Sequence, residues 1–183
     1  MDFITAYLNS EIDEEVYMEQ PYGFVKDSTK VCRIRKGLYG LKQSARQWNK
    51  KLTQFLTDLG FRKCSADHSV FTKGTLRNGL TITTYVDDMK IIGNAKAAIQ
   101  GLKDQLSSAF KMTDLGPISY YLGMKVIRDR TKRTISLSQK AYFERVLKTF
   151  GMDEGRTNKT PMAAGLYLTK ATEQATKAAT KEY

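Results

Sequence analysis

Histidine, cysteine and proline, which commonly build metal sites, disulfides and rigid turns, are scarce in this chain. Its 183 residues include 1 histidine, 2 cysteines and 3 prolines. Cys32 and Cys64 have no metal-ligand spacing and give no disulfide framework, so we interpret them as reduced thiols. His68 has no ligand partner in the sequence, and we expect it to be structural. The composition therefore excludes a zinc module and a disulfide-rich secreted domain.

Long apolar runs are absent as well. No stretch approaches the roughly 20 apolar residues that cross a bilayer, and no charged-then-apolar leader opens the chain. An apolar share of 41% is nevertheless sufficient for a folded core. We therefore expect a soluble protein that stays inside the cell, built as one large domain or a few lobes.

Acidic residues are missing from one long segment. No Asp or Glu lies between Ser28 and Thr57, and the whole chain carries a formal net charge of +11. A second basic cluster lies at 125–133, where only Asp129 is acidic. Such clusters suit a polyanion held along its phosphates, although solvated faces of helices and hairpins give the same pattern. The cations of the first segment are Lys30, Arg33, Arg35, Lys36, Lys42, Arg46, Lys50 and Lys51.

The segment Leu80–Gly93 places two acids between two β-like runs. It reads LTITTYVDDMKIIG, so β-branched and aromatic residues flank Asp87 and Asp88. This pattern predicts a hairpin with the acids at or near its tip. An Asp-Asp pair is most often a solvated turn, but adjacent carboxylates between apolar strands repel each other and require a compensating cation. Mg²⁺ takes oxygen ligands and fits this requirement.

Periodicity predicts the other elements. Helices are expected at 44–59 and 94–110, with Ser44 and Asn94 as N-cap residues, and from Ser138 onward. Strands are expected at 14–20, 30–36, 67–73, 80–85, 89–93, 120–127 and 133–137, with a short edge strand at 111–114. The last helix is expected to bury Tyr142, Phe143, Val146, Leu147 and Phe150.

Several segments resemble one known family. The string Tyr85–Asp88 looks like the signature of reverse transcriptases, and Met1–Ser10 resembles the first catalytic block of the enzymes of Ty1/copia-type retrotransposons. The likeness continues in order through nearly the whole chain, so we expect an RNA-directed DNA polymerase domain of that type. The other matching segments are 15–24, 38–44 with Trp48, 114–123, 137–142, 150–152, 160–162 and 168–170.

The resemblance implies a fold and a domain plan. The fold class is α+β, with a palm-type antiparallel sheet backed by helices, partial fingers and the start of a thumb. Residues 1–115 would form the palm with partial fingers, and residues 116–152 a primer-grip hairpin and a thumb-like helix. Residues 153–183, whose later part is rich in Thr, Ala and Lys, would form a flexible linker.

The resemblance also implies a catalytic site. Asp2, Asp87 and Asp88 would be catalytic and would hold two Mg²⁺ ions for phosphoryl transfer. Tyr39 stands where retroviral relatives have Gln, so the role of that Gln does not carry over. The residues that would contact the incoming dNTP are Phe3, Tyr7 and Gly40, with Tyr7 beneath the sugar. The residues that would contact the RNA or DNA template and its primer are Lys42, Arg46, Tyr85, Val86, Leu122 and Gly123.

The ends of the chain leave two functional interpretations open. Family members carry fingers strands before the first catalytic Asp, whereas this sequence begins one residue before Asp2. We therefore expect an N-terminally truncated domain whose site lacks part of its supporting shell. It is either a polymerase domain or a non-catalytic nucleic-acid-binding remnant, and a structural or regulatory relic with neither activity is the alternative to both. By resemblance, its location would be a cytoplasmic virus-like particle or the nucleus.

Overall fold

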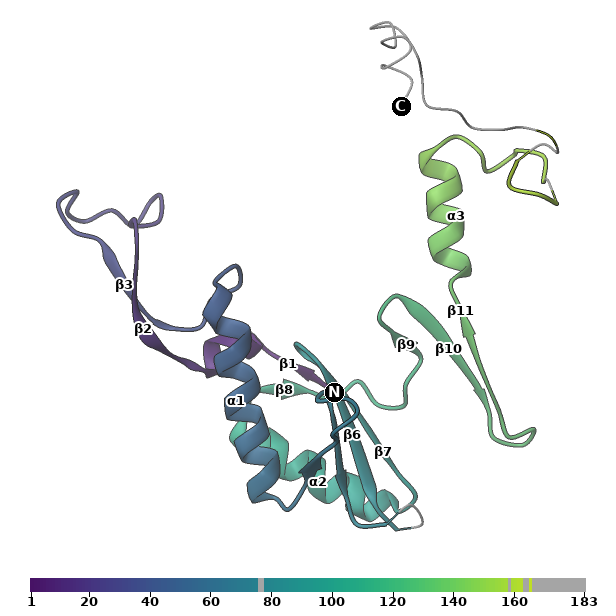
Figure 1. Cartoon of the computed structure of the whole chain (residues 1–183), viewed down its shortest axis with the longest axis horizontal. Coiled ribbons are helices and arrows are strands. Elements are labelled where there is room, and N and C mark those ends of the chain that lie inside the picture. Colours follow the sequence, from purple (N-terminus) through teal and green to yellow (C-terminus); the bar gives the residue numbers. More distant parts are fainter. Residues whose placement is uncertain (76–77, 158, 163–164, 166–183) are drawn as a thin grey trace, which may run out of the picture. The chain divides into compact units, whose positions relative to one another are not determined.

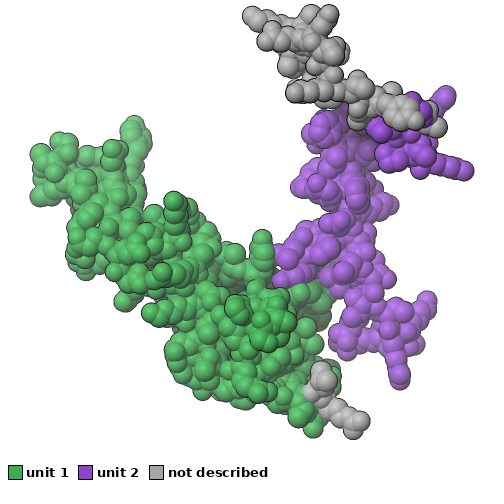
Figure 2. Space-filling model, viewed as in Figure 1, with its two compact units in different colours: residues 1–119 green, residues 120–183 purple. Residues whose placement is uncertain are grey.

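The computed structural model describes residues 1–75, 78–157, 159–162 and 165. The chain divides into two compact units, Met1–Ser119 and Tyr120–Tyr183, which Figure 2 shows in different colours. Most of the predicted linker at 153–183 lies outside the described residues. None of the helices in the described part of the chain combines the length and the apolar character needed to span a bilayer.

The first unit is built on a six-stranded sheet in which every neighbouring pair of strands is antiparallel (Figure 1). The strand order is β4-β5-β6-β7-β1-β8. Strand β1 therefore lies between β7 and β8, although it is the first strand of the chain. The strands are β1 (Asp2–Phe3), β4 (Arg62–Lys63), β5 (Val70–Lys73), β6 (Leu80–Tyr85), β7 (Asp88–Gly93) and β8 (Met112–Thr113).

Two helices cover one face of this sheet (Figure 1). Helix α1 spans Lys42–Asp58 and α2 spans Lys96–Ala109, and a short 3₁₀ helix, η1, spans Ala6–Asn9. Alternation along the strands turns every second side chain toward the helices. The buried core joins both layers and consists of Phe3, Ala6, Trp48, Leu52, Leu56, Phe61, Phe71, Ile82, Met89, Leu102, Leu106 and Phe110.

The predicted caps of both helices are wrong. Leu41 holds the N-cap position of α1 and Ala95 that of α2, and neither makes a side-chain capping bond. Ser44 lies inside the first turn of α1, where its buried hydroxyl donates to the carbonyl of Leu38 at 2.7 Å. Serine is common at the N-cap position because its side chain can accept a backbone N–H of the first helical turn. Ser44 does not mark the helix start here, because its hydroxyl is bonded to the carbonyl of Leu38.

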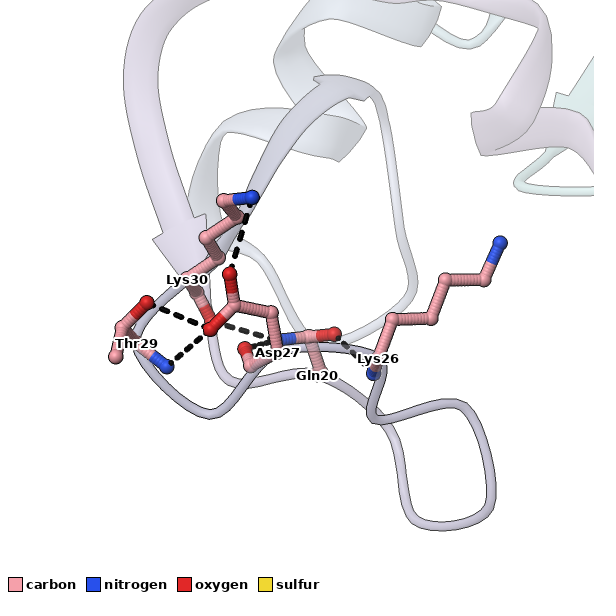
Figure 3. A network of polar contacts seen from close by, with 5 residues as sticks. All are labelled: Gln20, Lys26, Asp27, Thr29 and Lys30. Carbon is pink, nitrogen blue, oxygen red and sulfur yellow. Dashed lines mark hydrogen bonds and ion pairs between the residues drawn. The ribbon is translucent and has the colours of Figure 1, made fainter.

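A hairpin of β2 (Glu11–Met18) and β3 (Cys32–Lys36) forms a separate two-stranded sheet. Its long connection is held by the Gln20 side chain, whose Nε2 donates to the carbonyls of Asp27 at 2.6 Å and Lys30 at 2.7 Å (Figure 3). The Oε1 of Gln20 accepts from the backbone N–H of Lys26 at 2.9 Å. Because all these bonds are local, the connection keeps its shape without a hydrophobic core of its own.

The second unit contains a three-stranded sheet and one helix among its described residues (Figure 1). Its elements are β9 (Tyr120–Tyr121), β10 (Met124–Asp129), β11 (Thr134–Ser138) and α3 (Lys140–Thr149). The predicted single strand at 120–127 is wrong. Leu122 and Gly123 have φ values of 47° and 78°, so they form a two-residue turn that separates β9 from β10.

The predicted burial of α3 is also wrong. No residue of α3 is buried, and 58% of Phe143 and 73% of Phe150 are exposed. An apolar stripe shows which side of a helix can be buried, but burial itself requires a packed neighbour. The coarse prediction is confirmed: the chain is a mixed α and β protein with a multi-stranded antiparallel sheet and three α-helices in its described part.

Candidate functional site

The three predicted acids lie at neighbouring positions of the six-stranded sheet. Asp2 of β1 is paired directly with Asp88 of β7. Asp87 lies in the turn before β7, and its carbonyl accepts the backbone N–H of Phe3 at 2.8 Å. Asp2 and Asp88, which are 86 positions apart in sequence, therefore meet on two adjacent strands, and Asp87 lies one residue before Asp88 in the turn.

Asp2 and Asp88 share one face of the sheet. Their neighbours Phe3 and Met89 are buried in the core under the helices. Because successive side chains of a strand point to opposite faces, Asp2 and Asp88 point away from that core. Both are half-buried, as is Asp87. The core packing of one face thus fixes the position of the carboxylates on the other.

The negative charges of the neighbouring acids disfavour ionisation of Asp2. Partial burial, followed by the charges of Asp88 and Asp87, raises the pKa of Asp2 above its ordinary value. Within the described residues, none of the three carboxylates takes part in a salt bridge. The site therefore gathers negative charge, which the N-terminal ammonium of Met1 offsets in part at Asp2.

The turn that carries the acids is strained and anchored. Val86 has a φ of 54°, which is unusual for a β-branched residue because its Cβ crowds the backbone there. The indole Nε1–H of buried Trp48 donates to the carbonyl of Val86 at 3.1 Å and ties the turn to α1. Trp48 belongs to a segment that resembles the family, but the sequence gave no sign of that bond.

Tyr39 is a site residue that the sequence did not predict. Its hydroxyl donates to Oδ1 of Asp87 at 2.7 Å. Its ring packs on Tyr7, with centroids 4.5 Å apart and the planes tilted by 37°. Burial and the bond to Asp87 raise the pKa of Tyr39 to about 12, so the hydroxyl keeps its proton at neutral pH. The only signal in the sequence is its place in the segment that resembles the second family motif.

A pocket of about 250 Å³ lies beside the turn. It brings together Tyr7, Tyr85 and Val86, which were predicted separately as nucleotide and nucleic-acid contacts, and it is flanked by Trp48 of α1. The remaining lining residues are Ala45, Asn49, Leu52, Ser69 and Thr84. The pocket combines an apolar and aromatic wall with hydroxyl and amide groups, which suits a partly aromatic ligand.

The other predicted residues are more scattered. The Phe3 side chain is in the core, and Gly40 has a φ of 97° with no atom within 4 Å of a Cβ placed there. Lys42 and Arg46 are exposed on α1, and Arg46 pairs with Asp13 at 3.6 Å. Leu122 and Gly123 belong to the second unit.

The three acids have the chemistry that Mg²⁺ requires of its ligands. Their carboxylates supply the oxygen atoms that this ion takes, and their mutual repulsion favours a bound cation. As the side chains stand, no three acidic, histidine or cysteine groups of the described residues are arranged to hold one ion together. The residue types therefore fit the ion, whereas a complete ligand shell requires at least one side chain to turn.

Comparison with known proteins agrees with the residue pattern. The family described as reverse transcriptase (RNA-dependent DNA polymerase) matches residues 1–164. No solved structure matches the chain.

Three similar proteins show how much of each relative the chain represents. It is 44% identical over 173 residues to the retrovirus-related Pol polyprotein from transposon TNT 1-94 of Nicotiana tabacum, covering 93% of this chain and 13% of that protein. It is 36% identical over 171 residues to the corresponding polyprotein from transposon RE2 of Arabidopsis thaliana, covering 92% and 12%. It is 30% identical over 164 residues to a transposon Ty5-1 protein of Saccharomyces cerevisiae, covering 88% and 53%.

The chain thus spans about an eighth of the plant polyproteins and about half of the yeast protein. The match to the family extends over most of the chain, from the block around Asp2 through the Tyr85–Asp88 turn and into the second unit. The chain belongs to the reverse transcriptase (RNA-dependent DNA polymerase) family, as a reverse transcriptase domain of the Ty1/copia type.

Proposed function

We propose that this chain carries out divalent-metal-dependent nucleotidyl transfer, extending a DNA primer on an RNA or DNA template. In this reaction the primer 3′-hydroxyl attacks the α-phosphorus of a dNTP, the new phosphodiester bond forms, and pyrophosphate leaves. The observation that carries the proposal is the meeting of Asp2, Asp87 and Asp88 on adjacent strands, together with membership of the family.

The acids would hold the metal. Asp2 and Asp88 face the same side of the sheet, and Asp87 is one residue away in the turn. When bound there, two Mg²⁺ ions would stabilise the charge on the attacking and leaving oxygens. Partial burial and the charges of Asp88 and Asp87 raise the pKa of Asp2, which supports this assignment because a bound cation would relieve the repulsion among the three carboxylates.

Substrates would bind around the acids. Tyr7, Phe3 and Gly40 would form the dNTP site, with Tyr7 under the sugar and Phe3 acting through its backbone, since its side chain is buried. Tyr85 and Val86 line the pocket beside the turn and would contact the primer terminus. Lys42 and Arg46 on α1 would contact phosphates, and the turn Leu122–Gly123 would act as part of the primer grip.

The palm, fingers and thumb assignments are part of this proposal. The six-stranded sheet with α1 and α2 would be the palm, the β2–β3 hairpin would belong to the fingers, and α3 would begin the thumb. The exposed apolar side chains of α3 support a thumb role, because they leave a face available for contact with a nucleic acid or another part of a longer protein.

A second function has a specific observation in its favour. Since no three ligand-type side chains of the described residues are arranged to hold an ion, the chain could bind nucleic acid without catalysing transfer. The basic surfaces would remain, including a hollow of about 220 Å³ lined by Arg128, Arg130 and Arg133.

Primer extension separates the two functions. The 183-residue chain is mixed with a primed RNA template, the four dNTPs and Mg²⁺, and the Asp87→Asn variant serves as the comparison. We expect extension by the natural chain and a loss of at least about 100-fold in the variant, because the variant removes a metal ligand. Both proteins should unfold at similar temperatures, since the substitution removes like-charge repulsion and no core contact.

Binding without extension would support the remnant instead. In that case a labelled primer-template duplex should bind both proteins equally, and the affinity should fall steeply with salt because phosphate contacts release counterions. Equal extension rates for the natural chain and Asp87→Asn would contradict the proposed catalytic role of the acids.

A further inference from the structure

One side chain occupies two parts of the proposed site at once. The Tyr39 hydroxyl bonds to Asp87, a proposed metal ligand, at 2.7 Å, while its ring packs on Tyr7, the proposed sugar platform, at 4.5 Å between centroids. A metal ion would need the oxygens of Asp87, and a nucleotide sugar would need the ring of Tyr7. Tyr39 occupies one carboxylate oxygen of Asp87 and lies against the ring of Tyr7.

The backbone around Tyr39 is fixed. Tyr39 and Gly40 are the central residues of a turn in which the Leu41 N–H donates to the Leu38 carbonyl at 3.3 Å. The same carbonyl accepts the hydroxyl of Ser44, which is fully buried in α1. The φ of 97° at Gly40 suits the third position of such a turn. The turn is therefore anchored on the helix, and a movement of Tyr39 would be a rotation of its side chain.

The Tyr39 side chain is free to make that rotation. It is 52% exposed, so a change of its side-chain rotamer can turn the ring into solvent. It is held in the site by the bond to Asp87, by a hydrogen bond between its hydroxyl and the backbone of Ala6, and by the ring contact with Tyr7. Each of these contacts contributes on the order of 1 kcal/mol. Interactions of that size can be replaced by a bound cation and a sugar.

We propose that Tyr39 is a displaceable occupant of the nucleotide site: it holds Asp87 and covers Tyr7 in the free protein, and it swings away when the metal and the nucleotide bind. The proposal rests on the proposed nucleotidyl transfer function. It also accounts for the arrangement of the acids, because the bond from Tyr39 keeps Asp87 directed at the hydroxyl and away from a shared ligand shell.

The hydroxyl is tested by cation binding alone. Mn²⁺ is titrated into the 183-residue chain and followed by electron paramagnetic resonance, with natural protein compared with Tyr39→Phe. Because the variant keeps the ring and loses the competing bond, we expect it to bind Mn²⁺ about tenfold more tightly. In an Asp87→Asn background the same Tyr39→Phe change should have no effect, since Asp87 is the group that it releases.

Tyr17 provides a matched control. It is 53% exposed, its hydroxyl also reaches a carboxylate, Glu15, at 3.4 Å, and it lies on β2 in the other sheet of the first unit. Tyr17→Phe should leave Mn²⁺ affinity unchanged. An equal gain in Tyr17→Phe would show a general effect of removing a tyrosine hydroxyl and would overturn the proposal.

The ring is tested by nucleotide binding. A fluorescent dTTP analogue is titrated in the presence of Mn²⁺ against Tyr39→Phe and Tyr39→Ala. Only the alanine variant uncovers Tyr7, so we expect it to bind the analogue several-fold more tightly than the phenylalanine variant does. If Tyr39→Ala bound the nucleotide more weakly, Tyr39 would be part of the binding surface and the proposal would be overturned.

The outcomes separate this proposal from the proposed function. Unchanged or weaker Mn²⁺ binding by Tyr39→Phe, including no binding by either protein, overturns the displacement of Tyr39. Primer extension by the natural chain would still support nucleotidyl transfer in that case. Tighter binding that depends on Asp87, together with an absence of extension, would support the displacement and contradict the catalytic function.

Discussion

The folded structure disfavours the charged form of the Asp2 carboxyl. Its pKa is raised from an ordinary value of 3.8 by partial burial and by the charges of Asp88 and Asp87. The folded carboxyl therefore binds its proton more readily than the unfolded one. By linkage, the contribution of Asp2 to stability is most favourable below pH 3.8 and falls as the pH rises through its raised folded pKa.

This pH dependence of stability predicts the effect of the substitution Asp2→Asn. At pH 7 the variant should be more stable than the natural chain, by up to about 1 kcal/mol, because the amide carries no charge. Well below pH 3.8, where the carboxyl is protonated in both the folded and the unfolded state, the two proteins should unfold at the same denaturant concentration. Urea unfolding at a series of pH values measures the difference.

Asp104→Asn is the control for that experiment. Asp104 is exposed on α2 and accepts a bond from Gln100 at 2.8 Å, which asparagine can also accept. Its substitution should change stability little at either pH. If Asp2→Asn raised the stability equally at low and at neutral pH, the cause would not be the charge of Asp2, and the prediction would be contradicted.

Between elements, Gly37 determines how closely the segment after β3 can approach η1. A Cβ at this position would lie 2.6 Å from the carbonyl oxygen of Tyr7 and 2.8 Å from the hydroxyl of Ser10. The Gly37 N–H also donates to the Ser10 carbonyl at 3.0 Å. The strand end that leads to Tyr39 and the helix that carries Tyr7 are thus joined at a point where only glycine fits.

Gly37→Ala should therefore destabilise the first unit by about 1–3 kcal/mol, the usual range for overpacking against atoms that cannot move freely. Thermal or urea unfolding followed by circular dichroism measures the loss. Gly101→Ala is the matched control, because Gly101 lies inside α2 with no atom within 4 Å of its Cβ position. There alanine should add up to about 1 kcal/mol through its helix propensity. Equal effects of the two substitutions would contradict the close-approach argument.

Across the whole molecule, the hydrophobic core lies in one unit. Every residue of the buried cluster in the described part of the chain falls between Phe3 and Phe110. The second unit has a hairpin sheet and a helix with no buried residue. Since apolar burial is the main source of folding free energy, the first unit carries the stability of the fold.

A shortened chain tests this distribution. Residues 1–119 should unfold cooperatively, with a midpoint close to that of the 183-residue chain, because the fragment keeps the whole buried cluster. Differential scanning calorimetry measures both midpoints. Failure of the fragment to unfold cooperatively would mean that the second unit contributes contacts on which the core depends.

Much of the fold followed from local patterns. The acidic hairpin, strands β2 and β3, helices α1 and α2, and the edge strand β8 all lie where the sequence predicted them, with ends shifted by a few residues. The spacing of apolar side chains indicates whether a segment is a helix or a strand and which face is buried, so these elements could be predicted from the sequence. The helix caps and the turn at Leu122–Gly123 were not predicted from the sequence. Each depends on a particular hydrogen bond or backbone angle, and the same residues can adopt other local conformations.

The sequence by itself determined the family and the types of most elements, because these depend on residue order and spacing. Only the tertiary structure decided that Asp2 lies opposite Asp88, that Trp48 holds the strained Val86, and that Tyr39 binds Asp87 while covering Tyr7. The physical reason is that strand register and side-chain rotation depend on the packing of distant segments, and residue spacing does not specify either.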